Sequence, residues 1–127
     1  MPDNANYAQN WYDEEFNDYG PFSGQTIDER VAKLKSGDLK LSDDPINYVV
    51  RDGHTLILNT RSAQVLERAG IPRSKWYAVN KTGDEEAERA LDEQLRKNGL
   101  TSEGTPRLMT REEWRKAGHP LWPRKRR

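Results

Sequence analysis

A chain of 127 residues has room for one domain with one hydrophobic core. Its apolar and charged fractions are both 33% and its mean hydropathy is −1.10, which predicts a small core and some extended or loosely packed chain. The absence of cysteine excludes disulfides and thiolate metal sites, and two histidines exclude a multi-histidine site, so we expect no metal and no cofactor. No run approaches the roughly 20 apolar residues of a membrane helix, and MPDNANYAQN lacks a signal-peptide pattern, so we expect a soluble domain without membrane insertion.

The formal charge is zero, from 21 basic and 21 acidic residues, but the two signs are separated along the chain. Residues 1–30 hold seven acids and one base, whereas residues 107–127 hold eight bases and two acids. A basic terminal run is typical of elements that bind nucleic acid or an anionic surface, and it is equally typical of a solvated tail. The acidic segment could fold back on the basic tail or could be the end of a linker.

Residues 1–25 contain several aromatic side chains without a clean period, which indicates a loosely structured lead whose aromatics dock on the core. A capping box of Thr26 and Glu29 then predicts a helix near 26–35. We expect this helix to open a single domain over residues 26–117, followed by a basic tail over 118–127.

Two β-rich runs around Asp52-Gly53 are the strongest local signal in the chain and predict a β-hairpin. Trp76 and Tyr77 alternate along a third predicted strand, so one should pack inside and the other should face outward. The pattern as a whole predicts a small α+β fold, with hairpin strands 46–50 and 55–59, strand 75–79, and helices near 26–35, 61–69, 84–97 and 110–117.

The segment from Asn59 to Ser62 joins the hairpin to the next helix. Backbone N–H groups at such a junction can bind an anion such as phosphate, and Arg61 would add a planar fork suited to phosphate oxygens. Ordinary capping by Asn59 or Thr60 is the alternative. At the hairpin turn, His54 could act as a general acid or base next to Arg51, although a histidine in a turn is often inert.

The segment from Asn80 to Asp84, with Lys81 and Thr82 inside it, forms a second strand-to-helix junction that offers an amide, a hydroxyl and a cation. If the second and third strands are neighbours, both junctions lie at the same end of the sheet, where open sheets bind ligands. An outward-facing Tyr77 could stack on a base. Thr105 lies in a polar stretch, 101–106, that could supply further donors or could be a plain loop. The glutamates 85, 86 and 88 are typical of a solvated helix face.

The stretch PINYVVRDGHTLILNTRSAQVLERAGIPRSKWYAVNKTGD, with LDEQLRKNGLTSEGTP after it, resembles the C-terminal toxin domains of bacterial polymorphic toxins, of the contact-dependent growth-inhibition and Rhs types. The similarity runs from about Tyr7 to Pro106 and centres on LNTRSA and AGIP. The same stretch is also similar to the ParB/sulfiredoxin-type core, in which a hairpin feeds a helix through a phosphate-facing junction. Here Leu58-Asn59-Thr60 replaces that family's glycine-rich box, and the sulfiredoxin cysteine is absent.

The toxin resemblance implies a domain cut from a secreted or cell-surface protein, delivered into the cytoplasm of a neighbouring bacterium and neutralised by a cognate immunity protein. Many such domains are nucleases, often ribonucleases that act on transfer RNA. Our hypothesis is a metal-independent ribonuclease with catalytic groups His54, Thr60, Arg61, Asn80 and Thr82, and with substrate contacts from Arg51, Asn59, Ser62, Tyr77, Lys81 and Thr105. A DNA-directed toxin with the ParB-like core and a non-enzymatic nucleic-acid or protein-binding module are the alternatives.

Overall fold

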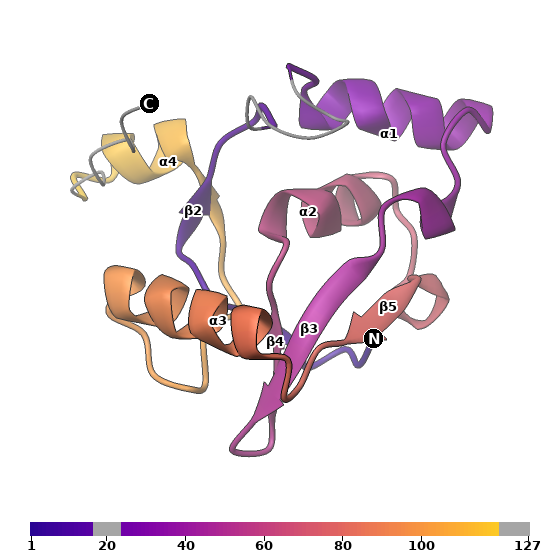
Figure 1. The fold of residues 1–127 in the computed structure, drawn as a ribbon. Coiled ribbons are helices and arrows are strands. Elements are labelled where there is room, and N and C mark those ends of the chain that lie inside the picture. The colour runs from indigo at the N-terminus through magenta and orange to yellow at the C-terminus, as the bar shows by residue number, and fades with distance from the viewer. Residues whose placement is uncertain (17–23, 120–127) are drawn as a thin grey trace.

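The computed structural model describes residues 1–16 and 24–119 of the chain. Over these residues the predicted α+β fold is confirmed, with helices packed on a small mixed sheet (Figure 1). The elements in chain order are β1 Asn6–Tyr7, β2 Trp11–Tyr12, α1 Ile27–Ser36, the 3-10 turn η1 Leu41–Asp43, β3 Ile46–Arg51, β4 His54–Ile57, α2 Thr60–Arg68, the 3-10 turn η2 Arg73–Lys75, β5 Ala78–Asn80, α3 Glu85–Asn98, β6 Met109–Thr110 and α4 Arg111–Lys116.

The main sheet has the strand order β1-β4-β3-β5. The hairpin β3–β4 is antiparallel, whereas β1 pairs with β4 and β5 pairs with β3 in parallel. At the hairpin turn, Asp52 and Gly53 both have positive φ, at 53° and 80°, which is the conformation that an Asp-Gly turn is selected for. The third strand begins later than predicted, because residues 73–75 form the turn η2 and pairing with β3 starts only at Ala78.

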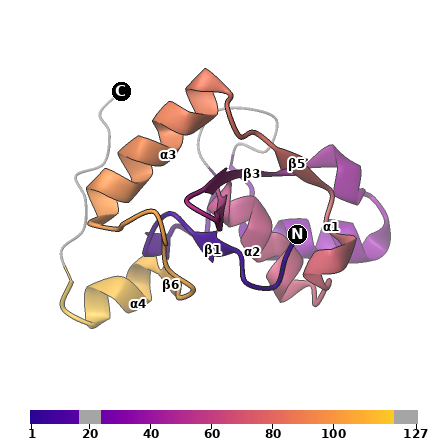
Figure 2. The same cartoon turned by 90° about the horizontal axis from the view of Figure 1, so that it is seen from below.

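Helices cover the two faces of the sheet differently (Figure 2). On one face, Ile46 and Ile57 pack with Ala63 and Leu66 of α2, and α1 lies on the outer side of α2. On the other face, α3 buries Leu91 against Val49. The core is therefore a thin layer on each face of the four short strands, with a third cluster of Tyr12, Ile27 and Val65 between β2, α1 and α2.

The described part of the N-terminal lead is more ordered than the sequence predicted. Asn6–Tyr7 adds a strand beside β4, and Trp11–Tyr12 pairs with β6 in a separate two-stranded parallel ladder. Tyr7 and Tyr12 are only 3% and 7% exposed. Of the other aromatics in the lead, Tyr19 and Phe22 lie outside the described residues, as does most of the basic tail.

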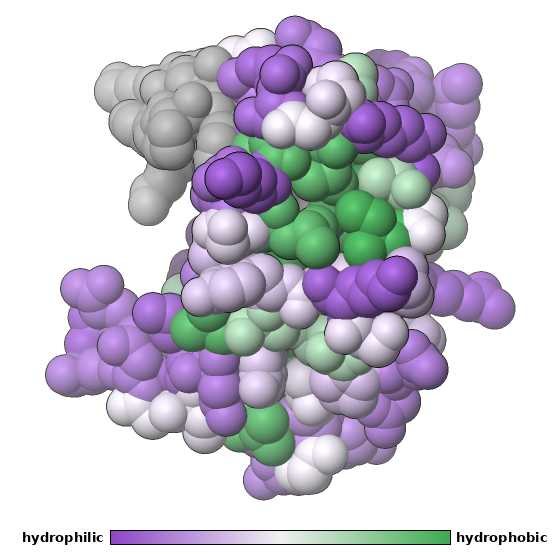
Figure 3. Space-filling view, turned by 90° about the vertical axis from the view of Figure 1, so that its right-hand side faces the viewer, coloured by the Kyte–Doolittle hydropathy of each residue, from purple (hydrophilic) through white to green (hydrophobic). Residues whose placement is uncertain are grey.

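Apolar side chains reach the surface on the side where α1, η1 and β5 meet (Figure 3). A crevice there has a volume of about 10 Å³, close to the minimum that one water molecule needs. Its apolar lining consists of Leu34, Leu39, Leu41, Val65 and Leu66. The crevice is therefore a packing seam between α1 and its neighbours. Among the described residues, no helix is both long and apolar enough to cross a bilayer.

The loop before β6 depends on a glycine. At Gly104, φ is +66°, and an added Cβ would lie 2.5 Å from the Tyr7 carbonyl oxygen and 2.7 Å from Leu56 Cδ2. We expect Gly104→Ala to lower the free energy of unfolding by about 1–2 kcal/mol through the backbone conformation and by about 1–3 kcal/mol more through the clash.

The matched control is Gly99→Ala, because Gly99 has a similar φ of +65° and open space where a Cβ would be added. Urea unfolding of both variants measures the difference. Equal destabilisation of the two would contradict the close packing of the 101–106 loop on β1.

Candidate functional site at the end of the hairpin

The two junctions that were predicted to share one pocket lie at opposite ends of β3. Asn59 is beside the start of β3, where its Oδ1 accepts a hydrogen bond from Asn47 N at 2.8 Å. Thr82 is beside the end of β3, where its Oγ1 accepts a hydrogen bond from Val50 N at 2.9 Å. Three residues of strand, roughly 10 Å, separate these two points.

The prediction of one shared rim was wrong because it treated the second and third predicted strands as neighbours. In the structure β3 lies between β4 and β5 and runs antiparallel to one and parallel to the other. The carboxyl-terminal ends of β4 and β5 therefore lie at opposite ends of the sheet. A pocket that combines residues 59–62 with residues 80–84 does not form.

The first junction is a buried structural element. Asn59 caps no helical amide with its side chain, because its side-chain amide bonds to Asn47 N and to the Pro45 carbonyl. Thr60 and Ser62 are 3% and 7% exposed, and Thr60 Oγ1 has no hydrogen-bond partner among the described residues. An incoming phosphate could reach neither hydroxyl without a rearrangement, so their predicted phosphate contacts are not supported.

Arg61 holds the N-terminal lead in place. Its guanidinium donates to the Glu15 carbonyl and lies 6.0 Å from the centre of the Phe16 ring. Arg68, two turns further along α2, pairs with Glu14 and Asp28. Acidic residues at the start of the chain therefore contact arginines of α2.

The second junction meets the hairpin turn and forms what we call the hairpin-end cluster: Arg51, His54, Asn80, Thr82, Glu88 and Asp92. His54 stands directly opposite Arg51 in the β3–β4 register, so their side chains share one face of the sheet. Arg51 donates to Glu88 Oε1 at 2.5 Å and also binds Asp92, both on α3. Four sequence-predicted residues thus come together: Arg51, His54, Asn80 and Thr82. A fifth, Lys81, lies between Asn80 and Thr82 in the chain.

Hydrogen bonds fix the bend that leads into α3. Asn80 Oδ1 accepts from Thr82 N at 2.9 Å and from the Thr82 hydroxyl at 2.5 Å. Gly83 N donates to Glu88 Oε2 at 2.8 Å. These contacts give Asn80 and Thr82 a positioning role at the edge of the cluster.

Charge pairing sets the protonation of the cluster. The hydrogen bond to Glu88 raises the pKa of Arg51 above its ordinary value, despite the opposing effect of burial. The hydrogen bond from Gly83 N, followed by that from Arg51, lowers the pKa of Glu88. Near neutral pH the guanidinium is therefore charged and the carboxylate is ionised.

Removing the Glu88 charge tests this pairing. Because the pKa of Glu88 is lower in the folded chain than in the unfolded chain, its stabilisation is present above the unfolded value of about 4.3 and is lost as the pH falls through the folded value. We expect Glu88→Gln to lower the melting temperature at pH 7 and to have a smaller effect near pH 3. Glu86→Gln, on the same helical turn, is the control and should change little at either pH. A Glu88→Gln deficit that is equally large at both values would contradict the pairing.

Glu88 and Asp92 were not predicted from the sequence as site residues, and Glu88 was placed on a solvated helix face. They lie four residues apart and therefore on one face of α3. This spacing is the only local signal that both carboxylates could bind one cationic side chain. Glu88 is 28% exposed at its side chain, so it is not simply solvated. His54 is half-buried, and its side chain makes no hydrogen bond or ion pair with any described residue.

The remaining predicted site residues lie elsewhere. Tyr77 is 52% exposed just before β5, whereas Trp76 is 6% exposed, as the predicted alternation required. Thr105 exchanges backbone hydrogen bonds with Tyr7, and its side chain bonds to the backbone of Arg107. Thr105 is therefore part of a structural loop that packs on β1.

Comparison with protein-family models, with curated proteins and with solved structures finds no match to this chain. Among the described residues, no group of three or more histidine, aspartate or glutamate side chains is arranged to hold a metal ion.

Proposed function

We propose that this chain is an antibacterial toxin effector domain that cleaves RNA without a metal ion, and that the hairpin-end cluster is its reactive centre. The observation that carries the proposal is the position of His54 beside an arginine that two carboxylates hold in place. An unengaged imidazole next to a fixed guanidinium combines a proton acceptor with a phosphate-binding group. Arg51, and not the buried junction at residues 59–62, is then the phosphate-binding group.

The chemistry requires one base and one cation. His54 takes the proton of a ribose 2′-hydroxyl, the 2′-oxygen attacks the adjacent phosphorus, and the bond from phosphorus to the 5′-oxygen breaks. The departing 5′-oxygen takes a proton from solvent, and a cyclic phosphate remains. Arg51 has five N–H donors, and its contacts with Glu88 and Asp92 leave donors for the phosphate oxygens.

The remaining groups position the reacting ones. Glu88 and Asp92 hold the guanidinium of Arg51. The hydrogen bond between Asn80 and Thr82 fixes the bend that contains Lys81, next to the hairpin-end cluster. A DNA-directed activity of the ParB-like kind is the second candidate, and it would draw on the junction at residues 59–62. Thr60 and Ser62 are buried there, so that junction offers no hydroxyl to a phosphate of DNA. RNA is therefore the preferred substrate.

The biological setting follows from the toxin resemblance and is part of the proposal. The domain belongs to a secreted or cell-surface protein, acts in the cytoplasm of a target bacterium on RNA, transfer RNA first, and is neutralised by a cognate immunity protein. The basic tail adds affinity for the substrate through phosphate contacts, so cleavage should fall steeply as salt is raised.

Expression in bacteria followed by side-by-side extraction of RNA and DNA tests the function. We expect growth arrest with fragmented transfer RNA and intact DNA, and cleavage of purified transfer RNA by the purified domain in the presence of a chelator. Fragmented DNA would favour the DNA-directed alternative. Normal growth, with RNA intact even at high protein concentration, would favour a binding module and contradict the proposal.

A further inference from the structure

A row of side chains on the edge strand β5 lies open beside the hairpin-end cluster. The β5 ladder extends one residue beyond each end of the strand, because Ile46 N donates to the Tyr77 carbonyl and Lys81 N donates to the Tyr48 carbonyl. Tyr77, Val79 and Lys81 therefore alternate onto one face of the sheet. We call these three residues the edge row.

The edge row shares its sheet face with the cluster. Val79 is paired with Asn47, and the next residue on that side of β3 is Val49, which is buried against α3. Two residues further along the same side is Arg51, which also contacts α3. The row and the cluster thus form one continuous surface over β5 and the end of β3.

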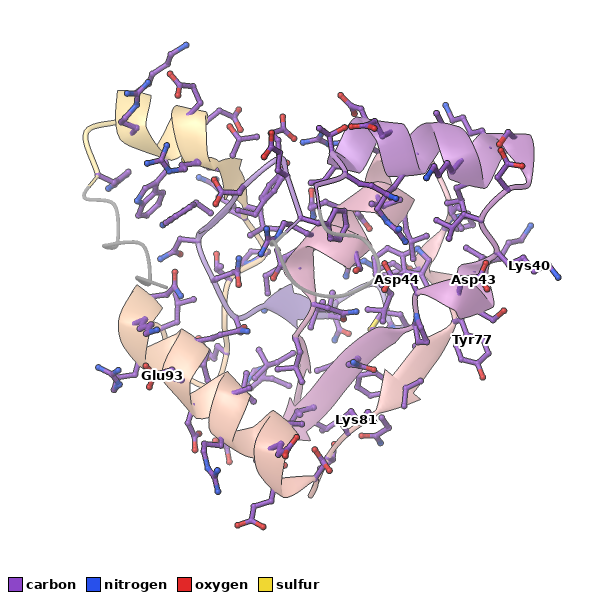
Figure 4. The ribbon with its side chains drawn as sticks, turned by 45° about the horizontal axis from the view of Figure 1, so that its top comes forward. Lys40, Asp43, Asp44, Tyr77, Lys81 and Glu93 are labelled. Atoms are coloured by element: carbon purple, nitrogen blue, oxygen red, sulfur yellow. The ribbon has the colours of Figure 1, made fainter. Side chains whose placement is uncertain are left out.

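Helix α3 packs on β3 and on Leu56 of β4 on this face, and the β5 side of the face stays exposed at Tyr77. Tyr77 is 52% exposed, and Val79 and Lys81 are both only partly buried. Figure 4 shows the Tyr77 and Lys81 side chains along the β5 side of the sheet, with Lys81 near the start of α3. From Tyr77 to Lys81 the strand spans roughly 13 Å.

Two lysines in and beside the edge row are available to a polyanion. Of the nearby carboxylates, Asp44 is paired with Arg30. Asp43 accepts from Lys40 N and Asp84 caps α3, so these two keep their negative charge but are turned toward their own backbone. Lys75 and Lys81, on either side of Tyr77 in the chain, make no ion pair with any described residue. An exposed aromatic ring flanked by free cations is the combination that binds single-stranded nucleic acid, because the ring stacks on a base and the cations meet the phosphates.

We propose that the edge row is the track for single-stranded RNA next to the cleaved phosphate, with a base stacked on Tyr77 and a phosphate at Lys81. The inference rests on the proposed function for the identity of the strand as substrate. It adds a direction to the site: the RNA runs along β5 and reaches Arg51 and His54 at the end of the hairpin.

A fluorescently labelled single-stranded DNA oligonucleotide of mixed sequence is the probe, because it lacks the 2′-hydroxyl and so can bind without being cleaved by this chemistry. We expect Tyr77→Ala to weaken its binding about 5- to 150-fold, and Tyr77→Phe to bind within about twofold of wild type. Lys81→Ala should lower the slope of log affinity against log salt by about 0.7. Val50→Ala is the matched control, because Val50 is 39% exposed on the opposite face of the sheet.

The outcomes separate this inference from the proposed function. Wild-type affinity of Tyr77→Ala overturns the track even if the domain cleaves RNA. Loss of toxicity in Tyr77→Ala with unchanged oligonucleotide affinity assigns the row to a protein partner and also overturns it. Weakened binding by Tyr77→Ala in a domain that cleaves no RNA keeps the track and removes the enzyme. Melting curves of each variant establish that the exposed substitutions leave the fold intact.

Discussion

The His54→Gln variant is expected to cleave RNA about 100- to 10,000-fold more slowly than the wild-type domain and to lose its toxicity. Glutamine is similar in size to histidine but cannot accept the proton of the 2′-hydroxyl. Because His54 is half-buried at the start of β4 and makes no side-chain hydrogen bond within the described chain, the fold should tolerate the change. Single-turnover cleavage of transfer RNA in chelator measures the effect.

The control for this experiment is the other histidine of the chain. His119 stacks on Trp114 with ring centroids 4.0 Å apart, beyond α4. His119→Gln should cleave RNA at close to the wild-type rate. Equal rates for wild type and His54→Gln would remove the histidine from the mechanism.

Arg51→Ala is expected to reduce cleavage about 100- to 1,000-fold, because the guanidinium stabilises the charge that develops on the phosphate. Arg51→Lys should recover little of the rate, since a lysine cannot match the planar grip of both Glu88 and Asp92. Arg89→Ala is the matched control, because Arg89 is a 74% exposed arginine of α3 that pairs only with Glu85 among the described residues.

Arg51 also joins β3 to α3, so the melting temperature of each variant must be compared with its activity. If Arg51→Ala does not fold, the rate of the charge-conserving Arg51→Lys variant decides. A folded Arg51→Lys variant with wild-type activity would contradict the proposed role of the planar guanidinium.

Elements with local signals were predictable from the sequence. The Asp52-Gly53 turn specifies the hairpin, and the capping boxes at Thr26 and Thr110 mark the starts of α1 and α4. Each of these signals is complete within a few residues. Their positions agree with the structure to within a residue or two.

Elements that depend on distant pairing were missed. The two-residue strand β1 exists only because Asn6 and Tyr7 pair with Leu56 and Ile57. No alternation can be read in two residues, so the lead looked unstructured. The strand order could not be predicted from local signals either. It determines where the site lies, because β3 between β4 and β5 places the two polar junctions at opposite ends of the sheet.

Only the part of the candidate site that is formed by local contacts could be predicted from the sequence. Arg51 and His54 are brought together by the hairpin, which is local, and both were singled out. Glu88 lies 37 residues from Arg51, and their ion pair depends on how α3 crosses the sheet. Arg61 was assigned to phosphate because its contact with Glu15, 46 residues earlier, has no sequence signature.

The central proposal is that nucleic acid binds this domain at the end of the β3–β4 hairpin. NMR titration of the isotope-labelled domain with a single-stranded DNA oligonucleotide tests that contact without requiring turnover. We expect shifts of the His54 ring signals and of the Thr82 and Gly83 amides, with the Thr60 and Ser62 amides unchanged. Shifts confined to the first turn of α2, with none at His54, would contradict the proposed site.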